Sequence, residues 1–204
     1  MSGLFGWLAR NARSIVLLDA ALLMGGVLLT AFNLLLMGWS VFIAGFVVAI
    51  VAFLAIAALN RRRMDGWSWT GVLLVLAGLV LALPAVATIW QTYLGRPDHA
   101  EMLLISQTYP IGLVADVVLW IGLAFYGLAA RGAGALPRGT GWVFLAAAVI
   151  GLLGDLLHAW PVSPLWWVPA MLVMTFGLVA AAGDPAPEPV IVTAPTTIPE
   201  PTAT

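Results

Sequence analysis

Six long apolar stretches constrain the fold of this chain more than any other feature. Each contains about 20 mostly apolar residues, the length that an α-helix needs to cross about 30 Å of hydrocarbon. The stretches run approximately over Ser14–Leu36, Trp39–Leu59, Trp67–Trp90, Pro110–Ala130, Gly141–Trp160 and Leu165–Ala182. We therefore expect an all-α integral membrane protein, built as a bundle of six transmembrane helices.

The composition agrees with a membrane protein and excludes several kinds of chemistry. Of the 204 residues, 63% are hydrophobic and 8% are charged, whereas soluble domains have about 45–50% apolar and about 25% charged residues. All eight basic residues are arginines and the net charge is −1, so no basic surface is available for a nucleic acid. The chain has no cysteine, which excludes thiol nucleophiles, disulfides and cysteine-ligated metals.

The arginines predict how the bundle is oriented. Seven of them flank the first helix or lie in the segments after the second and fourth helices: Arg10, Arg13, Arg61, Arg62, Arg63, Arg131 and Arg138. The other side of the membrane has Arg96 alone. Because positive residues concentrate in cytoplasmic loops, both termini are expected in the cytoplasm. Nine of the ten tryptophans fall near predicted helix ends, where indoles favour the headgroup layer, and Trp120 alone lies within a helix.

The chain divides into three parts by composition. Residues 1–13 combine apolar side chains with two arginines and predict a short interfacial segment that leads into a retained membrane anchor. Residues 14–182 form the six-helix transmembrane domain. Residues 183–204 are rich in proline and threonine and predict a disordered cytoplasmic tail. Between the third and fourth helices, Pro97, Asp98 and Glu101 predict a short external interfacial helix with a capping box.

Polar residues within apolar stretches are the candidates for function, since a charge near the bilayer centre costs at least about 2.5–3.5 kcal/mol. Asp19 follows soon after Arg13, and we interpret it as an acid at the inner interface that reaches water or an arginine. Asp116 lies about 9 Å along the fourth helix from its outer end. Asp155 and His158 are three residues apart and share one face near the outer end of the fifth helix.

Two interpretations of these polar residues stay open. In the first, Asp155 and His158 form hydrogen bonds with each other or with the fourth helix and hold the bundle together. A seam of small residues at Ala147, Gly151 and Gly154 on the same face would let that helix approach. In the second, the cluster forms an outer-leaflet pocket that accepts a proton or a divalent cation. That pocket contains Asp116, Asp155 and His158, with His99 from the external helix.

No pattern for catalysis or for an organic cofactor is present. The two histidines cannot be expected to face each other as haem ligands, because His99 lies in a predicted loop segment. Neither a serine–histidine triad spacing, nor an H-E-x-x-H sequence, nor a glycine-rich phosphate loop occurs. We therefore expect neither an enzyme nor a cofactor-binding protein, and the spacing of the acids and histidines matches no recognised metal motif.

One short motif resembles a known group of proteins. After Phe125, Tyr126 and Gly127, the chain continues through Gly134-Ala135-Leu136-Pro137-Arg138 into a new apolar stretch. This Gly-x-Leu-Pro-Arg turn between two late helices resembles a group of uncharacterised bacterial multi-pass membrane proteins, over the last two thirds of the membrane region. The resemblance implies a helical bundle in the bacterial cytoplasmic membrane and carries no catalytic residue to this chain.

These observations favour a non-catalytic membrane protein that serves as a structural or accessory subunit. Its partners would be the lipid bilayer and another membrane protein or further copies of itself. The competing hypothesis is a small carrier or an ion-responsive protein that uses the outer pocket, and a membrane-embedded enzyme ranks third.

Overall fold

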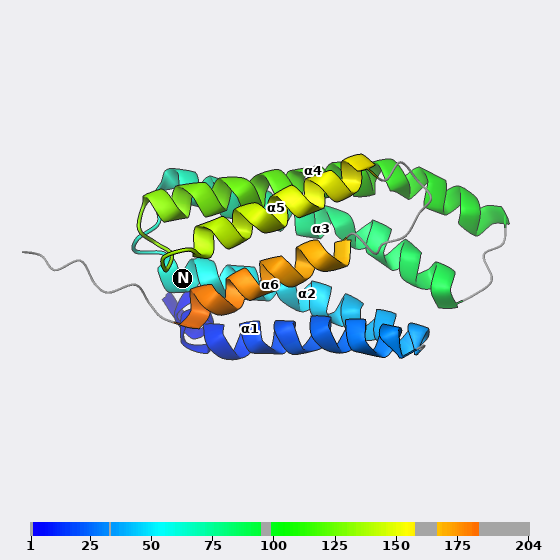
Figure 1. Ribbon diagram of the computed structural model, residues 1–204, viewed down its shortest axis with the longest axis horizontal. Coiled ribbons are helices and arrows are strands. Elements are labelled where there is room, and N and C mark those ends of the chain that lie inside the picture. Colours follow the sequence, from blue (N-terminus) through cyan, green and yellow to red (C-terminus); the bar gives the residue numbers. More distant parts are fainter. Residues whose placement is uncertain (1, 33, 95–98, 158–166, 184–204) are drawn as a thin grey trace, which may run out of the picture.

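All six apolar stretches form α-helices. The structure, a computed structural model, describes residues 2–32, 34–94, 99–157 and 167–183, and this part of the chain contains no strand. The helices are α1 (Ser2–Ala31), α2 (Leu35–Asn60), α3 (Gly66–Leu94), α4 (His99–Gly132), α5 (Thr140–Leu157) and α6 (Trp167–Gly183). The expected all-α helical bundle is therefore confirmed (Figure 1).

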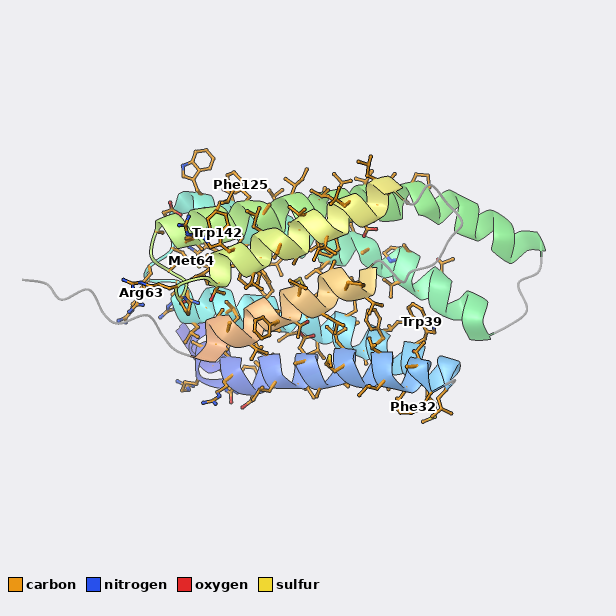
Figure 2. All side chains as sticks on the ribbon, viewed as in Figure 1. Phe32, Trp39, Arg63, Met64, Phe125 and Trp142 are labelled. Atoms are coloured by element: carbon orange, nitrogen blue, oxygen red, sulfur yellow. The ribbon has the colours of Figure 1, made fainter. Side chains whose placement is uncertain are left out.

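The helices lie side by side with their long axes roughly along one direction (Figure 1). α1 packs mainly on α2 and α3 mainly on α4, while α5 packs against α4 and α6, and α6 also contacts α1. One end of the bundle carries the N-terminus, the link from α2 to α3, the turn from α4 to α5 and the end of α6. Arg63 lies at this end, and Phe32 and Trp39 lie at the other (Figure 2). We call the first the arginine end.

Among the described residues, four helices are long and apolar enough to cross a membrane: Gly3–Ala31, Met37–Asn60, Gly66–Thr88 and Pro110–Gly132. Thr140–Leu156 and Val168–Gly183 are shorter apolar helices. Large apolar side chains such as Leu73 and Phe176 point away from the bundle on several helices. Soluble monomers rarely expose such extended apolar surface, so these outward faces suit lipid.

Close contacts between helices depend on glycine. A Cβ atom added to Gly78 of α3 would lie 2.5 Å from the backbone nitrogen of Leu119 on α4, and one added to Gly122 of α4 would lie 2.7 Å from the backbone nitrogen of Val75 on α3. Without a side chain at these positions, the two backbones approach closely and gain packing that lipid cannot supply. This packing joins α3 and α4 along much of their length.

An aromatic cluster fills the centre of the bundle toward the arginine end. Phe53 of α2 lies 5.1 Å from Tyr126 of α4 and 6.3 Å from Phe144 of α5, measured between ring centroids. Tyr126 and Phe144 are 5.5 Å apart, and all three side chains are buried. Edge-to-face contacts at these distances stabilise the core beyond the burial of area alone.

The Gly-x-Leu-Pro-Arg turn has a clear structural basis. Gly134 has φ of 67°, a left-handed conformation that glycine adopts at little cost. Its amide donates to Arg131, and the next amide, of Ala135, donates to Ala130 at 2.8 Å. This pair of bonds is a Schellman motif, which satisfies the last carbonyls of α4. Ala135 and Leu136 are then buried against the core.

Some predicted boundaries were wrong. The separate interfacial helix expected between the third and fourth helices does not exist as such, because α4 runs without a break from His99 to Gly132. Pro110 lies inside α4, where it removes one backbone donor but leaves the rest of the helix in place. Similarly, the expected N-terminal interfacial segment forms the first part of α1. The predicted disordered tail lies outside the described residues from position 184 onward.

Candidate functional site

Asp155 connects two helices. Its carboxylate on α5 accepts a hydrogen bond from the indole N–H of Trp120 on α4, with 3.1 Å between Nε1 and Oδ2. Trp120 is fully buried. A buried indole needs an acceptor for its N–H, and a carboxylate needs a donor, so each side chain supplies what the other lacks.

The predicted small-residue seam positions this hydrogen bond. Gly151 lies one turn before Asp155 on α5, and the Trp120 ring occupies the space where a Gly151 side chain would be. Ala147, a further turn away, is fully buried. The small residues on this face of α5 let the large ring pack directly against the helix, with its N–H directed toward Asp155.

Of the three candidate residues that the structure describes, Asp116 and Asp155 lie near one interface and His99 does not. Asp116 lies one turn before Trp120 on the same helix and is half-buried, so it lies near the interface that contains Asp155. His99 is the first residue of α4, about 25 Å from Asp116 along the helix axis, which excludes it from the proposed pocket. The prediction included His99 because it assigned this residue to a separate helix lying on the outer surface of the bundle. His158 lies outside the described residues.

No metal centre is evident in the described part of the chain. Within residues 2–32, 34–94, 99–157 and 167–183, no group of three or more histidines, cysteines, aspartates or glutamates lies close enough to hold a metal ion. Because His158 is outside these ranges, the mixed aspartate and histidine pocket stays a prediction.

Asp19 has an environment that the sequence interpretation missed. The expectation of an interfacial acid is wrong, because the side chain of Asp19 is fully buried. Its position follows from the buried face of α1, which contains Leu8, Ala12, Val16 and Leu23. Together with Asp19, these residues recur every three or four positions, as the packed face of a helix does. Asp19 occupies a core position of this apolar stripe, where an aliphatic residue would be ordinary.

The hydroxyl of Thr175 on α6 faces the Asp19 carboxyl. The two groups do not meet the geometry of a hydrogen bond. Among the described residues, neither Asp19 oxygen has any hydrogen-bond partner, and nor does the Thr175 hydroxyl. Three other threonines, Thr30, Thr70 and Thr88, donate to the carbonyl four residues earlier in their own helices. Thr175 forgoes this usual bond, so its hydroxyl stays available to Asp19.

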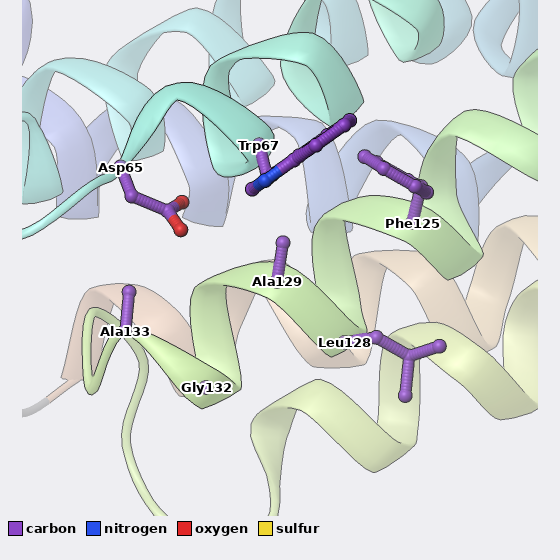
Figure 3. Close-up of a pocket in the computed structure, with 7 residues that line it drawn as sticks. All are labelled: Asp65, Trp67, Phe125, Leu128, Ala129, Gly132 and Ala133. Carbon is purple, nitrogen blue, oxygen red and sulfur yellow. The ribbon is translucent and has the colours of Figure 1, made fainter.

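A surface pocket of about 520 Å³ lies at the arginine end, between the start of α3 and the end of α4 (Figure 3). Its lining consists of Asp65, Trp67, Phe125, Leu128, Ala129, Gly132 and Ala133. The rings of Trp67 and Phe125 are in edge contact, with centroids 5.7 Å apart. The carboxylate of Asp65 points into the space between the two helices.

Asp65 has a structural role in this pocket. Its Oδ1 atom accepts bonds from the Ser68 hydroxyl at 2.6 Å and from the Ser68 amide at 2.8 Å, which caps the first turn of α3. The Ser68 hydroxyl, followed by the Ser68 amide, lowers the pKa of the Asp65 carboxyl below its ordinary value, because both donors favour the ionised form.

Comparisons with known proteins find no similarity to report: no family model, no curated protein and no solved structure matches this chain.

Two of the informative residues carried a signal in the sequence. Trp120 was noted as the one tryptophan within a helix, and an indole at that depth requires a buried acceptor. Asp19 follows Leu8, Ala12 and Val16 at helical spacing, which predicts its burial. Thr175 carried no such signal, because threonine in an apolar helix ordinarily bonds to its own backbone.

Proposed function

We propose that this chain is a non-catalytic, six-span protein of the bacterial cytoplasmic membrane, which acts as a structural or accessory subunit of a membrane assembly. The observation that carries this proposal is the hydrogen bond between Trp120 and Asp155. Asp155 was the centre of the candidate pocket, and its carboxylate contributes instead to helix packing. A polar residue that bonds to a neighbouring helix favours a structural role over a catalytic or transport site.

The arginine end supports the proposed orientation, with both termini in the cytoplasm. All seven arginines within the described residues belong to the first half of α1 or to helix ends and loops at this end. Three tryptophans near the starts of their helices, Trp7, Trp67 and Trp142, are exposed. Arg131 also lies 4.6 Å above the ring of Trp142. Arginines with exposed indoles are typical of a cytoplasmic membrane interface.

Purification from native membranes in a mild detergent tests the accessory role. We expect a tagged chain to elute with a partner protein, or with further copies of itself, at a fixed stoichiometry that persists through a second purification step. A single copy that alone moves an ion or solute across liposome membranes would contradict the proposal.

The competing proposal, an ion-responsive pocket at Asp116, Asp155 and His158, can be tested separately. Thermal stability of the wild type and of Asp155→Asn is measured with and without zinc, manganese or calcium, at about pH 5.5 and about pH 7.5. A cation that binds the folded state must raise its apparent stability as concentration rises. Under the accessory proposal, the two proteins respond alike. A cation-dependent gain that Asp155→Asn abolishes would instead favour the pocket.

Reporter fusions test the orientation. A reporter that is active only in the cytoplasm should be active after Thr204 and silent within Gln91–Tyr109. Replacement of Arg61, Arg62 and Arg63 should weaken this pattern more than replacement of Arg96, since the cluster contributes most of the charge asymmetry. The reverse activity pattern would contradict the topology.

A further inference from the structure

We propose that Asp19 and Thr175 form a proton-binding site within the bundle, and that the bound proton holds α1 against α6. The site goes beyond the accessory role proposed above and does not depend on it. It shares no residue with the pocket of Figure 3 and involves none of the residues predicted for the outer pocket.

The side chains of Asp19 and Thr175 are buried but form no hydrogen bond within the described residues. Asp19 is fully buried and Thr175 is almost fully buried, yet no oxygen of either side chain has a hydrogen-bond partner among the described residues. Buried polar groups are hydrogen-bonded in the great majority of cases, so a facing pair without bonds requires an explanation. A ligand that completes the pair would remove the deficit.

Asp19 also lacks a compensating charge on the helices packed against α1. α1 packs against α2 and α6. Residues 35–60 and 167–183, which form those two helices, contain no charged or titratable side chain that faces Asp19. The other charged residues of α1 are Arg10 and Arg13, both exposed. An ionised Asp19 would therefore be an isolated charge among apolar side chains, which is strongly unfavourable.

A proton is the ligand that suits this site. A sodium or divalent ion needs several oxygen ligands, and this site offers one carboxyl and one hydroxyl. A proton needs only one oxygen. A protonated carboxyl has one O–H donor and one carbonyl acceptor, and the Thr175 hydroxyl can both donate and accept. The protonated pair is therefore complementary, whereas an ionised carboxylate has acceptors only and would leave most of them unsatisfied.

Loss of the proton should consequently weaken the contact between α1 and α6. Near neutral pH, the folded bundle keeps this proton, whereas the unfolded chain has already lost it. The stability of the bundle therefore falls as pH rises. α6 forms its other contacts with α5 and α2, which allows it to separate from α1 while the rest of the bundle stays folded.

Infrared spectroscopy of the full chain in lipid nanodiscs tests the protonation directly. At neutral pH, the wild type should show the carbonyl stretch of a protonated carboxyl, and Asp19→Asn should lose that band. Asp155→Asn is the matched control and should keep it. Identical carboxyl bands in the wild type and in Asp19→Asn would overturn the proposal. Thr175→Val should keep the band but shift its frequency, and an unshifted band would exclude Thr175 from the site.

A pH series tests the effect on stability. The melting temperature of the wild type should fall by roughly 3–5 °C per pH unit from about pH 4, above which the unfolded carboxyl is ionised, and should level off once the folded carboxyl also ionises. Asp19→Asn, which imitates the protonated acid, should lose this part of the fall. If Asp19→Asn does not fold, Asp19→Leu replaces it, since leucine suits the apolar stripe. A slope in the folded variant as steep as that of the wild type would overturn the proposal.

Distance measurements test the link to α6. Because the chain has no cysteine, spin labels can be attached at L28C on α1 and F176C on α6, both exposed positions. The distance distribution should broaden toward longer values at high pH in the wild-type background and stay unchanged with Asp19→Asn. Labels at L73C and L128C on α3 and α4 are the control pair and should not respond. An unchanged α1–α6 distance across the series would overturn the coupling.

Discussion

The α4–α5 and α1–α6 interfaces each contain a buried or half-buried aspartate, yet they treat it differently. At α4–α5, Asp155 accepts a hydrogen bond from Trp120. At α1–α6, Asp19 faces Thr175 and has no hydrogen bond among the described residues. The difference shows that the presence of an acidic residue in an apolar helix does not by itself indicate its structural role. That role depends on whether the facing helix supplies a hydrogen-bond donor.

For the same reason, we expect the α4–α5 interface to stay unchanged with pH and the α1–α6 interface to weaken as pH rises. The Trp120 N–H is always protonated, and the Asp155 carboxyl keeps an acceptor oxygen whether or not it is ionised, so the bond persists over the physiological pH range. The complementarity of Asp19 and Thr175 depends on a proton that can leave. The following predictions test this contrast, beginning with the largest expected effect.

Gly151→Ala should cause the largest loss, because the new methyl group would occupy the space of the Trp120 ring. Displacement of the ring should also break its bond to Asp155, and we expect the bundle to lose about 2–3 kcal/mol of stability in reversible unfolding measurements. Gly132→Ala is the matched control, since nothing lies within 4 Å of its added Cβ atom, and it should stay within about 0.5 kcal/mol of the wild type. Equal effects of the two substitutions would show that Gly151 has no special packing role.

Trp120→Phe should cost about 2 kcal/mol, since it removes the N–H donor and part of the ring volume and leaves Asp155 without its bond. A double-mutant cycle with Asp155→Leu separates the two effects. The coupling energy should be about 0.5–1.5 kcal/mol. Strictly additive losses would show that the hydrogen bond contributes nothing to the α4–α5 interface.

Leucine substitutions at the two aspartates should have opposite signs. Asp155→Leu should lower stability by about 1 kcal/mol, because it leaves the Trp120 N–H without an acceptor. Asp155→Asn keeps an acceptor and should be nearly neutral. Asp19→Leu should instead raise the melting temperature at neutral pH, because leucine suits the apolar stripe of α1 and removes the cost of burying a carboxyl group. The comparison between the interfaces fails if both leucine variants shift stability in the same direction.

The smallest change in stability is expected at Asp65. This acid is exposed, whereas Asp19 is fully buried and Asp155 is half-buried. Its pKa is lowered in the folded state by the Ser68 hydroxyl and amide. The cap therefore stabilises α3 above the unfolded pKa of about 3.9, and this contribution disappears as pH falls through the lower folded pKa. Asp65→Ala should speed hydrogen exchange of the Ser68 amide at neutral pH, while Asp65→Asn should preserve its protection. A difference between wild type and Asp65→Ala that persists at strongly acidic pH would contradict this assignment.

The sequence predicted the helices well because apolar length is a local property. Each expected apolar stretch lies within or largely overlaps one described helix, whereas several ends differ. α3 continues to Leu94 and α4 begins at His99, because backbone hydrogen bonds extend past the point where apolar composition stops. Pro110 was interpreted as a boundary, although proline within a helix removes only one donor.

The sites were harder to predict because they depend on how helices face one another. The distance of Asp19 from Arg13 indicates a depth but gives no direction around the helix axis. The direction was present in the spacing of Val16 and Leu23, which shows that depth and face must be read together. The Trp120–Asp155 pair additionally requires the antiparallel register of α4 and α5, and nothing in the local pattern of either helix specifies it.

The α3–α4 hairpin extends past the other helices at the end opposite the arginines (Figure 1). Its helices have 29 and 34 residues, or about 43 and 51 Å at the usual rise per residue, against about 30 Å of hydrocarbon. Unless it tilts strongly, the hairpin must rise above the lipid surface. In the proposed orientation, the end of the hairpin would project outside the cell membrane and be accessible to water-soluble molecules. A force or ligand acting there would act on α4, the same helix that contains Trp120.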